Sequence, residues 1–169
     1  TREFSEVPRT DWAVHVALWE DGDLVAGAVA RPAAGFTYAT DRPTARPLGR
    51  PQRIRLAVSR TRPPEFVTAL GGALDAELVP MGSAGIKAMA VLADEVDAYV
   101  HAGGQYEWDS AAPVAVAQAA GLHTSRIDGS PLTYNQANPS LPDLVICRPE
   151  IASEILTAIA HLTTKEDIA

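Results

Sequence analysis

A proline-rich segment at residues 41–52, DRPTARPLGRPQ, separates two stretches of the chain that differ in patterning. Proline fixes φ and lacks a backbone N–H, so this segment cannot form the interior of a helix or of a central strand. Upstream of it, an Asp21-Gly22 turn and runs of strand-forming residues predict three strands, at 12–19, 24–32 and 35–40. Downstream of it, strand-like runs alternate with helical ones. This order predicts an antiparallel sheet followed by an α/β unit.

The downstream part is predicted to begin with a strand and to end with an amphipathic helix. Strands are expected at 53–59, 76–83, 96–102 and 143–148. Helices are expected at 64–74, 84–94, 110–120 and 149–162. Between them, residues 122–132 are predicted to form a hairpin with Asp128-Gly129 at its turn. With the boundary in 41–52 or near 60–64, we divide the chain into an antiparallel-sheet domain, 1–58, and an α/β domain, 59–169. The fold class is α+β or α/β.

Charge and composition limit the classes of partner. The chain has 169 residues and a formal net charge of −7, which argues against a nucleic acid polymer because such binding uses clustered basic residues. No run approaches the roughly 20 uncharged apolar residues of a membrane helix, so no membrane is expected. Cys147 is the single cysteine, which excludes an internal disulfide and fits a reducing cytoplasm. An acidic protein can still bind a small polyanion when divalent metal ions offset the repulsion.

The stretch EWDSAAPVAVAQAAG, residues 107–121, joins an acidic aromatic turn to an alanine-rich run. An Asp at the start of a helix accepts hydrogen bonds from free N–H groups and complements the helix dipole, so Asp109 is explained by capping alone. On this interpretation Pro113 lies in the first turn, where its missing N–H costs little, and Gly121 ends the helix. The residues by themselves leave open whether Asp109 only caps the helix or also binds a ligand.

Several motifs in order resemble the inositol monophosphatase-like family of metal-dependent phosphatases. They are Gly82-Ser83-Ala84 before a helix, VDAY (96–99) on a strand, WDSAAP (108–113), and then "DG.PL.YN" and "DLVIC". The segment DWAVHVALWEDGDLVAGAVARP is also similar to the central hairpin of the family. Within the family, SRTRPPE, GSAGIKAMAV and EWDSAAP are most similar to CysQ-type 3′(2′),5′-bisphosphate nucleotidases.

The resemblance implies a layered αβαβα sandwich. The initial TREF resembles the end of the family signature Asp-Pro-(Ile/Leu)-Asp-Gly-Thr, with Thr1 as its threonine. We therefore expect a C-terminal portion of a longer enzyme that lacks the N-terminal helices and first strands. A portion of this kind has lost most of the metal-binding carboxylates, so we expect it to be inactive alone. The alternative from another class of protein is a non-catalytic half that needs its missing N-terminal part.

The resemblance also implies an activity. It is the hydrolysis of 3′-phosphoadenosine 5′-phosphate, or of its 5′-phosphosulfate, by metal-activated water, in the context of sulfate assimilation. Asp109 is then a Mg²⁺ ligand that also touches the substrate, and Thr1 orients the attacking water. The alternative substrates within the family are inositol 1-phosphate and fructose 1,6-bisphosphate. HAGGQYE (101–107) lacks the glutamate by which inositol monophosphatases read sugar hydroxyls, which favours a nucleotide.

The substrate residues implied by the resemblance are Ser83, Ala84, Lys87, His101, Arg60 and Arg62. Two of them have a plainer alternative: Lys87 as a solvated helix lysine, and His101 as a histidine at a strand end. Arg62 stands where close relatives have a histidine, so the contact expected of it is with a phosphate or a stacked base instead. Trp108 is expected to pack and Glu107 to face solvent, and the other histidines are expected to be structural or exposed: His15, His123 and His161. The expected partner is a small phosphorylated nucleotide or sugar phosphate, and homodimer formation stays open.

Overall fold

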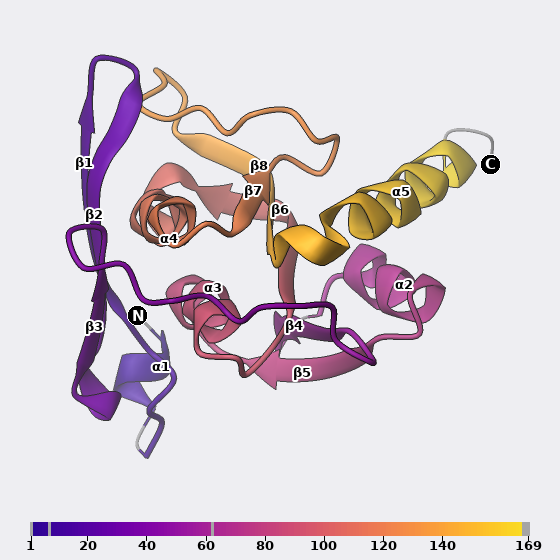
Figure 1. Ribbon diagram of the computed structural model, residues 1–169, viewed down its shortest axis with the longest axis horizontal. Helices are drawn as coiled ribbons and strands as arrows, with labels where there is room; N and C mark the ends of the chain where they lie inside the picture. Colours follow the sequence, from indigo (N-terminus) through magenta and orange to yellow (C-terminus); the bar gives the residue numbers. More distant parts are fainter. Residues whose placement is uncertain (1, 7, 62, 167–169) are drawn as a thin grey trace.

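The computed structural model describes residues 2–6, 8–61 and 63–166, which are arranged around two sheets (Figure 1). The first sheet is antiparallel, with the order β1-β2-β3, and its strands are Val14–Glu20, Asp23–Arg31 and Phe36–Ala39. The second sheet has the order β5-β4-β6-β8-β7. Its strands in chain order are β4 (Arg55–Ser59), β5 (Glu77–Met81), β6 (Ala98–Tyr106), β7 (His123–Ser125) and β8 (Ser140–Cys147). The predicted fold class is confirmed.

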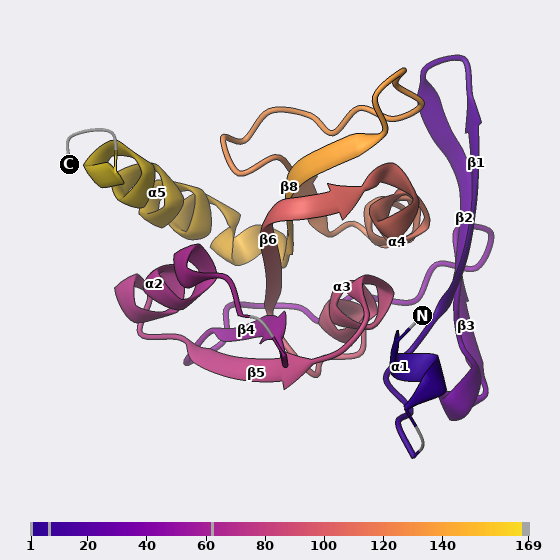
Figure 2. The same cartoon turned by 180° about the vertical axis from the view of Figure 1, so that it is seen from behind.

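The helices form layers with these sheets. The short α1 (Arg2–Ser5) and the 3-10 turn η1 (Pro32–Ala34) belong to the first part of the chain. The longer helices are α2 (Glu65–Ala73), α3 (Ala84–Leu92), α4 (Glu107–Ala119) and α5 (Pro149–Glu166). Figures 1 and 2 show α3 and α4 between the two sheets, and α2 with α5 on the far side of the five-stranded sheet. The succession of sheet, helices, sheet and helices is that of the expected sandwich from its first sheet onward.

The turn between β1 and β2 follows from its residues. Asp21 and Gly22 both have positive φ, 51° and 104°, which is the conformation that a two-residue hairpin turn requires. The strands then pair from Glu20↔Asp23 to Val14↔Ala30. The predicted Asp-Gly hairpin is confirmed.

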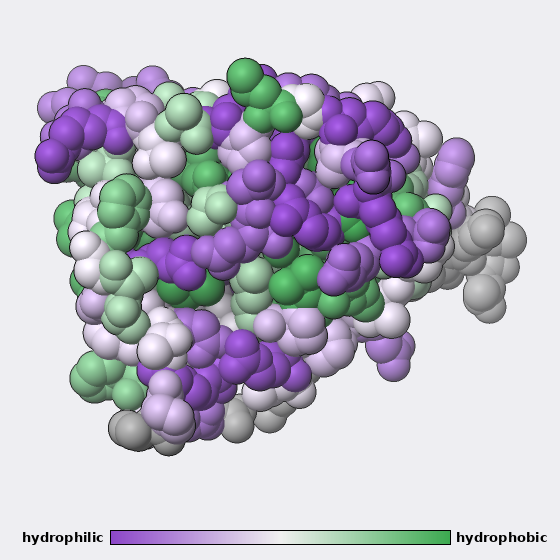
Figure 3. All heavy atoms as spheres, turned by 60° about the horizontal axis from the view of Figure 1, so that its bottom comes forward, coloured by the Kyte–Doolittle hydropathy of each residue, from purple (hydrophilic) through white to green (hydrophobic). Residues whose placement is uncertain are grey.

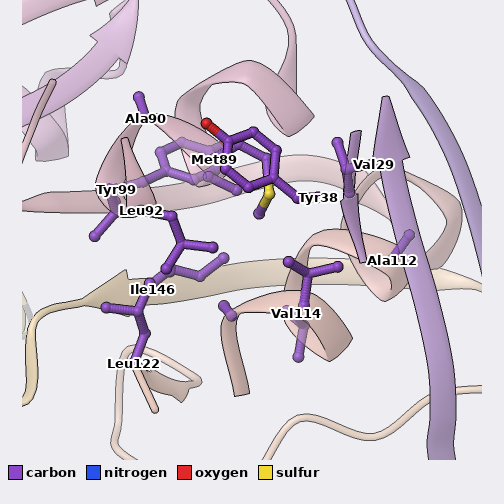
Figure 4. Packing of buried hydrophobic residues seen from close by; sticks show 14 of the residues in the cluster. Val29, Tyr38, Met89, Ala90, Leu92, Tyr99, Ala112, Val114, Leu122 and Ile146 are labelled. Carbon is purple, nitrogen blue, oxygen red and sulfur yellow. The ribbon is translucent and has the colours of Figure 1, made fainter. Parts of the chain in front are cut away.

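Two apolar cores hold the layers together. The first contains Val29 and Tyr38 of the first sheet with α3, α4 and the inner face of the second sheet (Figure 4). Helix α4 can lie close to β2 because Gly27 has no side chain, since a Cβ there would lie 2.7 Å from the Cβ of Ala115. The second core joins the other face of the five-stranded sheet to α2 and α5, through Ile151, Ile155 and Ile159 among others.

Residues 41–54 form an irregular connection along one side of the molecule, as the prolines predict (Figure 1). Three arginines tie this connection to the helical part, in the ion pairs Arg46–Glu150 at 2.8 Å, Arg50–Glu154 at 2.7 Å and Arg53–Asp75 at 3.0 Å. Figure 3 turns the bottom of Figure 1 toward the viewer, and hydrophilic residues cross that face with hydrophobic ones between them.

Several local predictions were wrong. Helix α4 begins at Glu107, so Pro113 is inside the helix rather than in its first turn. Residues 122–132 do not form a hairpin of their own, because β7 pairs with the distant β8 and only the turn at Arg126–Ser130 is present. Because β4 is a strand of the second sheet, the change of sheet lies before Arg55. The division into domains 1–58 and 59–169 stays a prediction.

Among the described residues, no helix is both long enough and apolar enough to cross a membrane. Cys147, in the apolar run LVIC of β8, is fully buried, and burial raises the pKa of its thiol to about 12.

Candidate active site

A cavity of about 580 Å³ lies where β1, β6 and the first turns of α3 and α4 meet. Five residues predicted from the sequence to bind metal or substrate line it together: Ser83, Ala84, Lys87, His101 and Asp109. They are spread over 27 positions of the chain, from 83 to 109, and reach one cavity because β6 connects α3 to α4. Their roles stay predictions, but the structure brings them to one place.

Two glycines bring Asp109 to the cavity. Gly103 and Gly104 have φ of 86° and 78°, values that residues other than glycine rarely adopt. The pairing of β6 with β8 shifts register between Ala102 and Gln105, so the glycines form a bulge that bends the end of β6. Helix α4 begins directly after this bend, at Glu107.

Asp109 is the third residue of α4, and its two carboxylate oxygens differ. Oδ2 accepts a hydrogen bond from the backbone N–H of Tyr106 at 3.0 Å, which caps the start of the helix. Oδ1 has no hydrogen-bond or ion-pair partner among the described residues. The capping interpretation is therefore correct for one oxygen, and the second oxygen is left for a ligand of the cavity.

The start of α3 forms the opposite wall. Ser83 has φ of 47°, and the N–H of Gly82 donates to Asp11 Oδ2 at 2.7 Å, which fixes the turn into the helix. Lys87, one turn further, is only 8% exposed, and its Nζ lies 5.2 Å from the centre of the Tyr99 ring. The interpretation of Lys87 as a solvated lysine was wrong, because this cation is buried beside the cavity.

His101 lies within β6 rather than at its end, so the plainer interpretation of this residue was also wrong. Burial lowers the pKa of His101, and the nearby charge of Lys87 lowers it further, while a hydrogen bond to the Gly103 backbone and the charge of Asp109 oppose the shift. The ring is therefore neutral at pH 7. Its Nε2 is buried and has no hydrogen-bond partner among the described residues.

His15 and Gln105 line the same cavity and were missed as site residues. His15 was expected to be structural or exposed; its ring is partly buried at the cavity wall, and burial lowers its pKa. The buried Gln105 donates from Nε2 to the Tyr99 hydroxyl at 2.6 Å. In AVHVA a histidine alternates with small residues on the inward side of a strand, and this pattern is the signal that could have found His15.

Arg60 lies apart from this cavity. It lines a smaller one, of about 40 Å³, that shares Ser59, Ser83 and Lys87 with the larger one, and its guanidinium pairs with Asp11 at 3.1 Å. The hydrogen bond from Arg9 is the main cause that lowers the pKa of Asp11 to about 2, against the opposing effect of burial. Thr1 and Arg62 lie outside the described residues.

Two expectations for the acidic aromatic turn were wrong. Trp108 is 61% exposed and stacks on Tyr106, with the ring centres 4.7 Å apart, instead of packing in the core. Glu107 does not simply face solvent, because its carboxylate accepts hydrogen bonds from the backbone N–H groups of Asn135 and Gln136 at 2.7 and 2.9 Å. It fixes the loop before β8 to the start of α4.

The donor atoms at the cavity fit a hard cation that keeps water ligands. No group of three or more His, Cys, Asp or Glu that could hold a metal ion occurs in the part of the chain that the structure describes. Mg²⁺ is typically bound by one or two carboxylates together with waters and substrate phosphates, and the unpartnered oxygen of Asp109 at this cavity suits that mode. Among the described residues that line this cavity, no third imidazole and no thiolate accompanies His15 and His101.

Comparison with known proteins identifies the class. The profile of the inositol monophosphatase family matches residues 1–163, and the chain belongs to this family. Solved structures agree in fold: an IMPase of Thermotoga maritima has a TM-score of 0.74 at 18% identity, with 93% of this chain and 64% of that chain covered. An inositol monophosphatase of Zymomonas mobilis has a TM-score of 0.73 at 19% identity, with 90% and 64% covered.

The similar curated sequences are more specific. The 3′-phosphoadenosine 5′-phosphate phosphatase of Mycobacterium bovis is 54% identical over 168 residues, which are 95% of this chain and 63% of that protein. The protein of the same name from Mycobacterium leprae is 53% identical over 174 residues, with 96% and 64% covered. The chain thus spans less than two thirds of the length of these relatives. The resemblance to CysQ-type nucleotidases within the family is confirmed.

Proposed function

We propose that this chain carries part of the active site of a Mg²⁺-dependent phosphatase that hydrolyses 3′-phosphoadenosine 5′-phosphate, or its 5′-phosphosulfate. The products are AMP, or adenosine phosphosulfate, and phosphate. The observation that carries the proposal is the identity of 53–54% with relatives that have this activity as their name. The second support is the cavity that joins Asp109, Lys87 and the start of α3.

The cavity suits a small phosphorylated molecule. Its volume of about 580 Å³ lies in the range of roughly 300–1,000 Å³ that is usual for small-molecule sites. We propose that Lys87 and the turn at Ser83 and Ala84 face a phosphate, because a cation and the N-terminal end of a helix both favour an anion. His101 would contact the nucleoside. Arg60 would act from the adjoining smaller cavity, where Asp11 holds its guanidinium.

Asp109 Oδ1 would hold the metal ion. When bound, Mg²⁺ supplies Lewis-acid polarisation of the phosphate and lowers the pKa of a water ligand. The residues of this chain hold the phosphate end of the substrate and, through Thr1, orient the attacking water. A water molecule that attacks phosphorus directly leaves no covalent intermediate on the protein.

Phosphate release by the whole protein tests the proposal. Turnover of 3′-phosphoadenosine 5′-phosphate that stops on chelation of Mg²⁺ and returns on its addition is the expected result. Preference for inositol 1-phosphate or fructose 1,6-bisphosphate would support the alternative substrates of the family instead. No release from any of the three, in folded protein with Mg²⁺, would end the proposal.

The proposal from another class is that residues 1–169 alone form a non-catalytic half. It is favoured by the single carboxylate that faces the cavity among the described residues. The chain expressed alone is then expected to give no Mg²⁺-dependent release, and measured release would contradict this. We further propose a cytoplasmic location, because a chain with a single cysteine has no internal disulfide and fits a reducing compartment. Homodimer formation would be tested by sedimentation.

A further inference from the structure

His15 occupies a position where the pattern of the sheet calls for an apolar residue. It lies on β1 and pairs with Val29, which is fully buried, while its neighbours Val14 and Val16 are exposed on the other face. The imidazole therefore points into the layer of α3 and α4. A polar ring there requires a specific reason, because burial of a polar group without a partner costs free energy.

The two nitrogens of the ring meet two different helices. Nδ1 lies 3.4 Å from the backbone carbonyl oxygen of Trp108, in the first turn of α4. A carbonyl oxygen only accepts, so Nδ1 carries the proton and Nε2 does not. Nε2 lies against Gly85 in the first turn of α3, where a Cβ would come within 1.9 Å of it. The glycine is thus needed for His15 to fit.

These contacts reach both walls of the cavity. The carbonyl of Trp108 belongs to the peptide group whose nitrogen is that of Asp109, so a bond to this oxygen restrains the backbone that carries the carboxylate. Gly85 follows Ala84, which lines the cavity from the α3 side. One side chain from the first sheet therefore sets the first turns of both helices relative to each other.

We propose that His15 is a positioning residue, which holds the Trp108–Asp109 peptide against the start of α3 and so places the carboxylate of Asp109 for a divalent cation. This inference rests on the proposed function. It assigns to His15 no contact with substrate. Removal of outer residues that orient metal ligands typically weakens metal binding by about 10–100-fold.

Mg²⁺ binding to the whole protein, followed by calorimetry, tests this inference. His15→Phe removes both nitrogens, and His15→Asn keeps an N–H close to the position of Nδ1. His123→Phe is the matched control, because His123 is also partly buried on a strand, but among the described residues its ring bonds only to Ser125 of the same strand, β7. We expect about tenfold weaker Mg²⁺ binding in His15→Phe, substantial recovery in His15→Asn, and no change in His123→Phe.

A second readout is independent of the metal. In the absence of Mg²⁺, hydrogen exchange at the first turn of α4 should be faster in His15→Phe than in wild type, and near wild type in His15→Asn. If His15→Phe does not fold, Gly85→Ala tests the same contact, because its Cβ displaces the imidazole. Unchanged Mg²⁺ binding and exchange in the folded variants, or His15→Asn as weak as His15→Phe, would overturn the inference. Wild-type protein that binds no Mg²⁺ but shows the exchange difference would instead contradict the proposed function alone.

Discussion

Strand β6 has an aspartate near each end, and the two carboxylates have different surroundings. Asp97, just before the strand, is fully buried and accepts hydrogen bonds from the backbone N–H and guanidinium of Arg55 at 2.8 and 3.0 Å. Arg148 pairs with it at 2.6 Å. Asp109, just after the strand, has one oxygen bonded to the Tyr106 N–H and the other unpartnered among the described residues at a cavity.

The different surroundings of the two carboxylates give Asp97 a structural role and leave Asp109 available for a functional one. A carboxylate whose oxygens are all bonded by its own protein stabilises the fold and has nothing to offer a ligand. Burial alone would raise the pKa of Asp97, but the hydrogen bonds of Arg55 and the charge of Arg148 lower it overall, so the carboxylate is ionised at pH 7. Asp109 has an oxygen to spare, which a cation can use.

The largest expected effect is on activity, at the functional end of the strand. Asp109→Asn should reduce the turnover of the whole protein by about 10³-fold, the loss typical of a group that stabilises transition-state charge. The N–H of Tyr106 keeps an acceptor in the amide oxygen, so the thermal midpoint should stay near that of wild type. Assays of phosphate release and thermal unfolding check both expectations. If Asp109→Asn lost activity only because it unfolds, Asp109 would act as a structural residue like Asp97, and the distinction between the two aspartates would be wrong.

The second largest effect is expected on stability, at Asp97, which lies at the other end of β6. Asp97→Asn removes one of the two carboxylates that pair with the guanidinium of Arg148, which is only 5% exposed as a residue, and leaves it the more exposed Asp94 alone. Removal of one partner from a buried ion pair costs about 3–5 kcal/mol of unfolding free energy. Urea unfolding measures this loss, and the fraction that stays folded should keep its activity. A variant as stable as wild type but inactive would reverse the assignment of the two aspartates.

A smaller effect is expected opposite Asp109. Lys87→Met keeps the buried aliphatic stem but removes the charge, and we expect the KM for the bisphosphate to rise about tenfold because one charge-assisted contact is lost. Steady-state kinetics with Lys87→Arg as the control check this, since that variant keeps a cation. An unchanged KM in Lys87→Met would contradict the proposal that the substrate phosphate binds at this cavity.

The smallest effect concerns pH and the Asp11 cluster. The pKa of Asp11 is lowered from 3.8 to about 2, so its bonds contribute stability that is fully present above pH 3.8 and is lost as the pH falls through about 2. Asp11→Asn should therefore cost about 1–2 kcal/mol at pH 7, and the difference from wild type should shrink in acid. Unfolding measured from pH 7 to pH 2 checks the direction, and a constant difference would contradict it.

The sequence predicted what depends on neighbouring residues. The Asp21-Gly22 turn, the irregular proline segment and the apolar face of α5 follow from local geometry and are present. The motifs around Asp109 predicted residues that do meet at one cavity.

What the sequence left undecided depends on contacts between distant residues. Three such contacts join segments far apart in the chain. They are the pairing of β7 with β8, the contact of His15 with Gly85, and the hydrogen bonds of Glu107 to the loop at 135–136. Local patterning carries no signal for such partners. For the same reason it could not tell that Asp97 is saturated by Arg55 and Arg148 while Asp109 is not.

A crystal structure of the whole protein with Mn²⁺ in place of Mg²⁺, located by anomalous scattering, tests the central claim most directly. We predict an ion directly coordinated by Asp109 Oδ1, at close to the roughly 2.0–2.1 Å typical of Mg²⁺, and no ion near Asp97. An ion bound elsewhere, with the Asp109 carboxylate turned from it, would contradict the account.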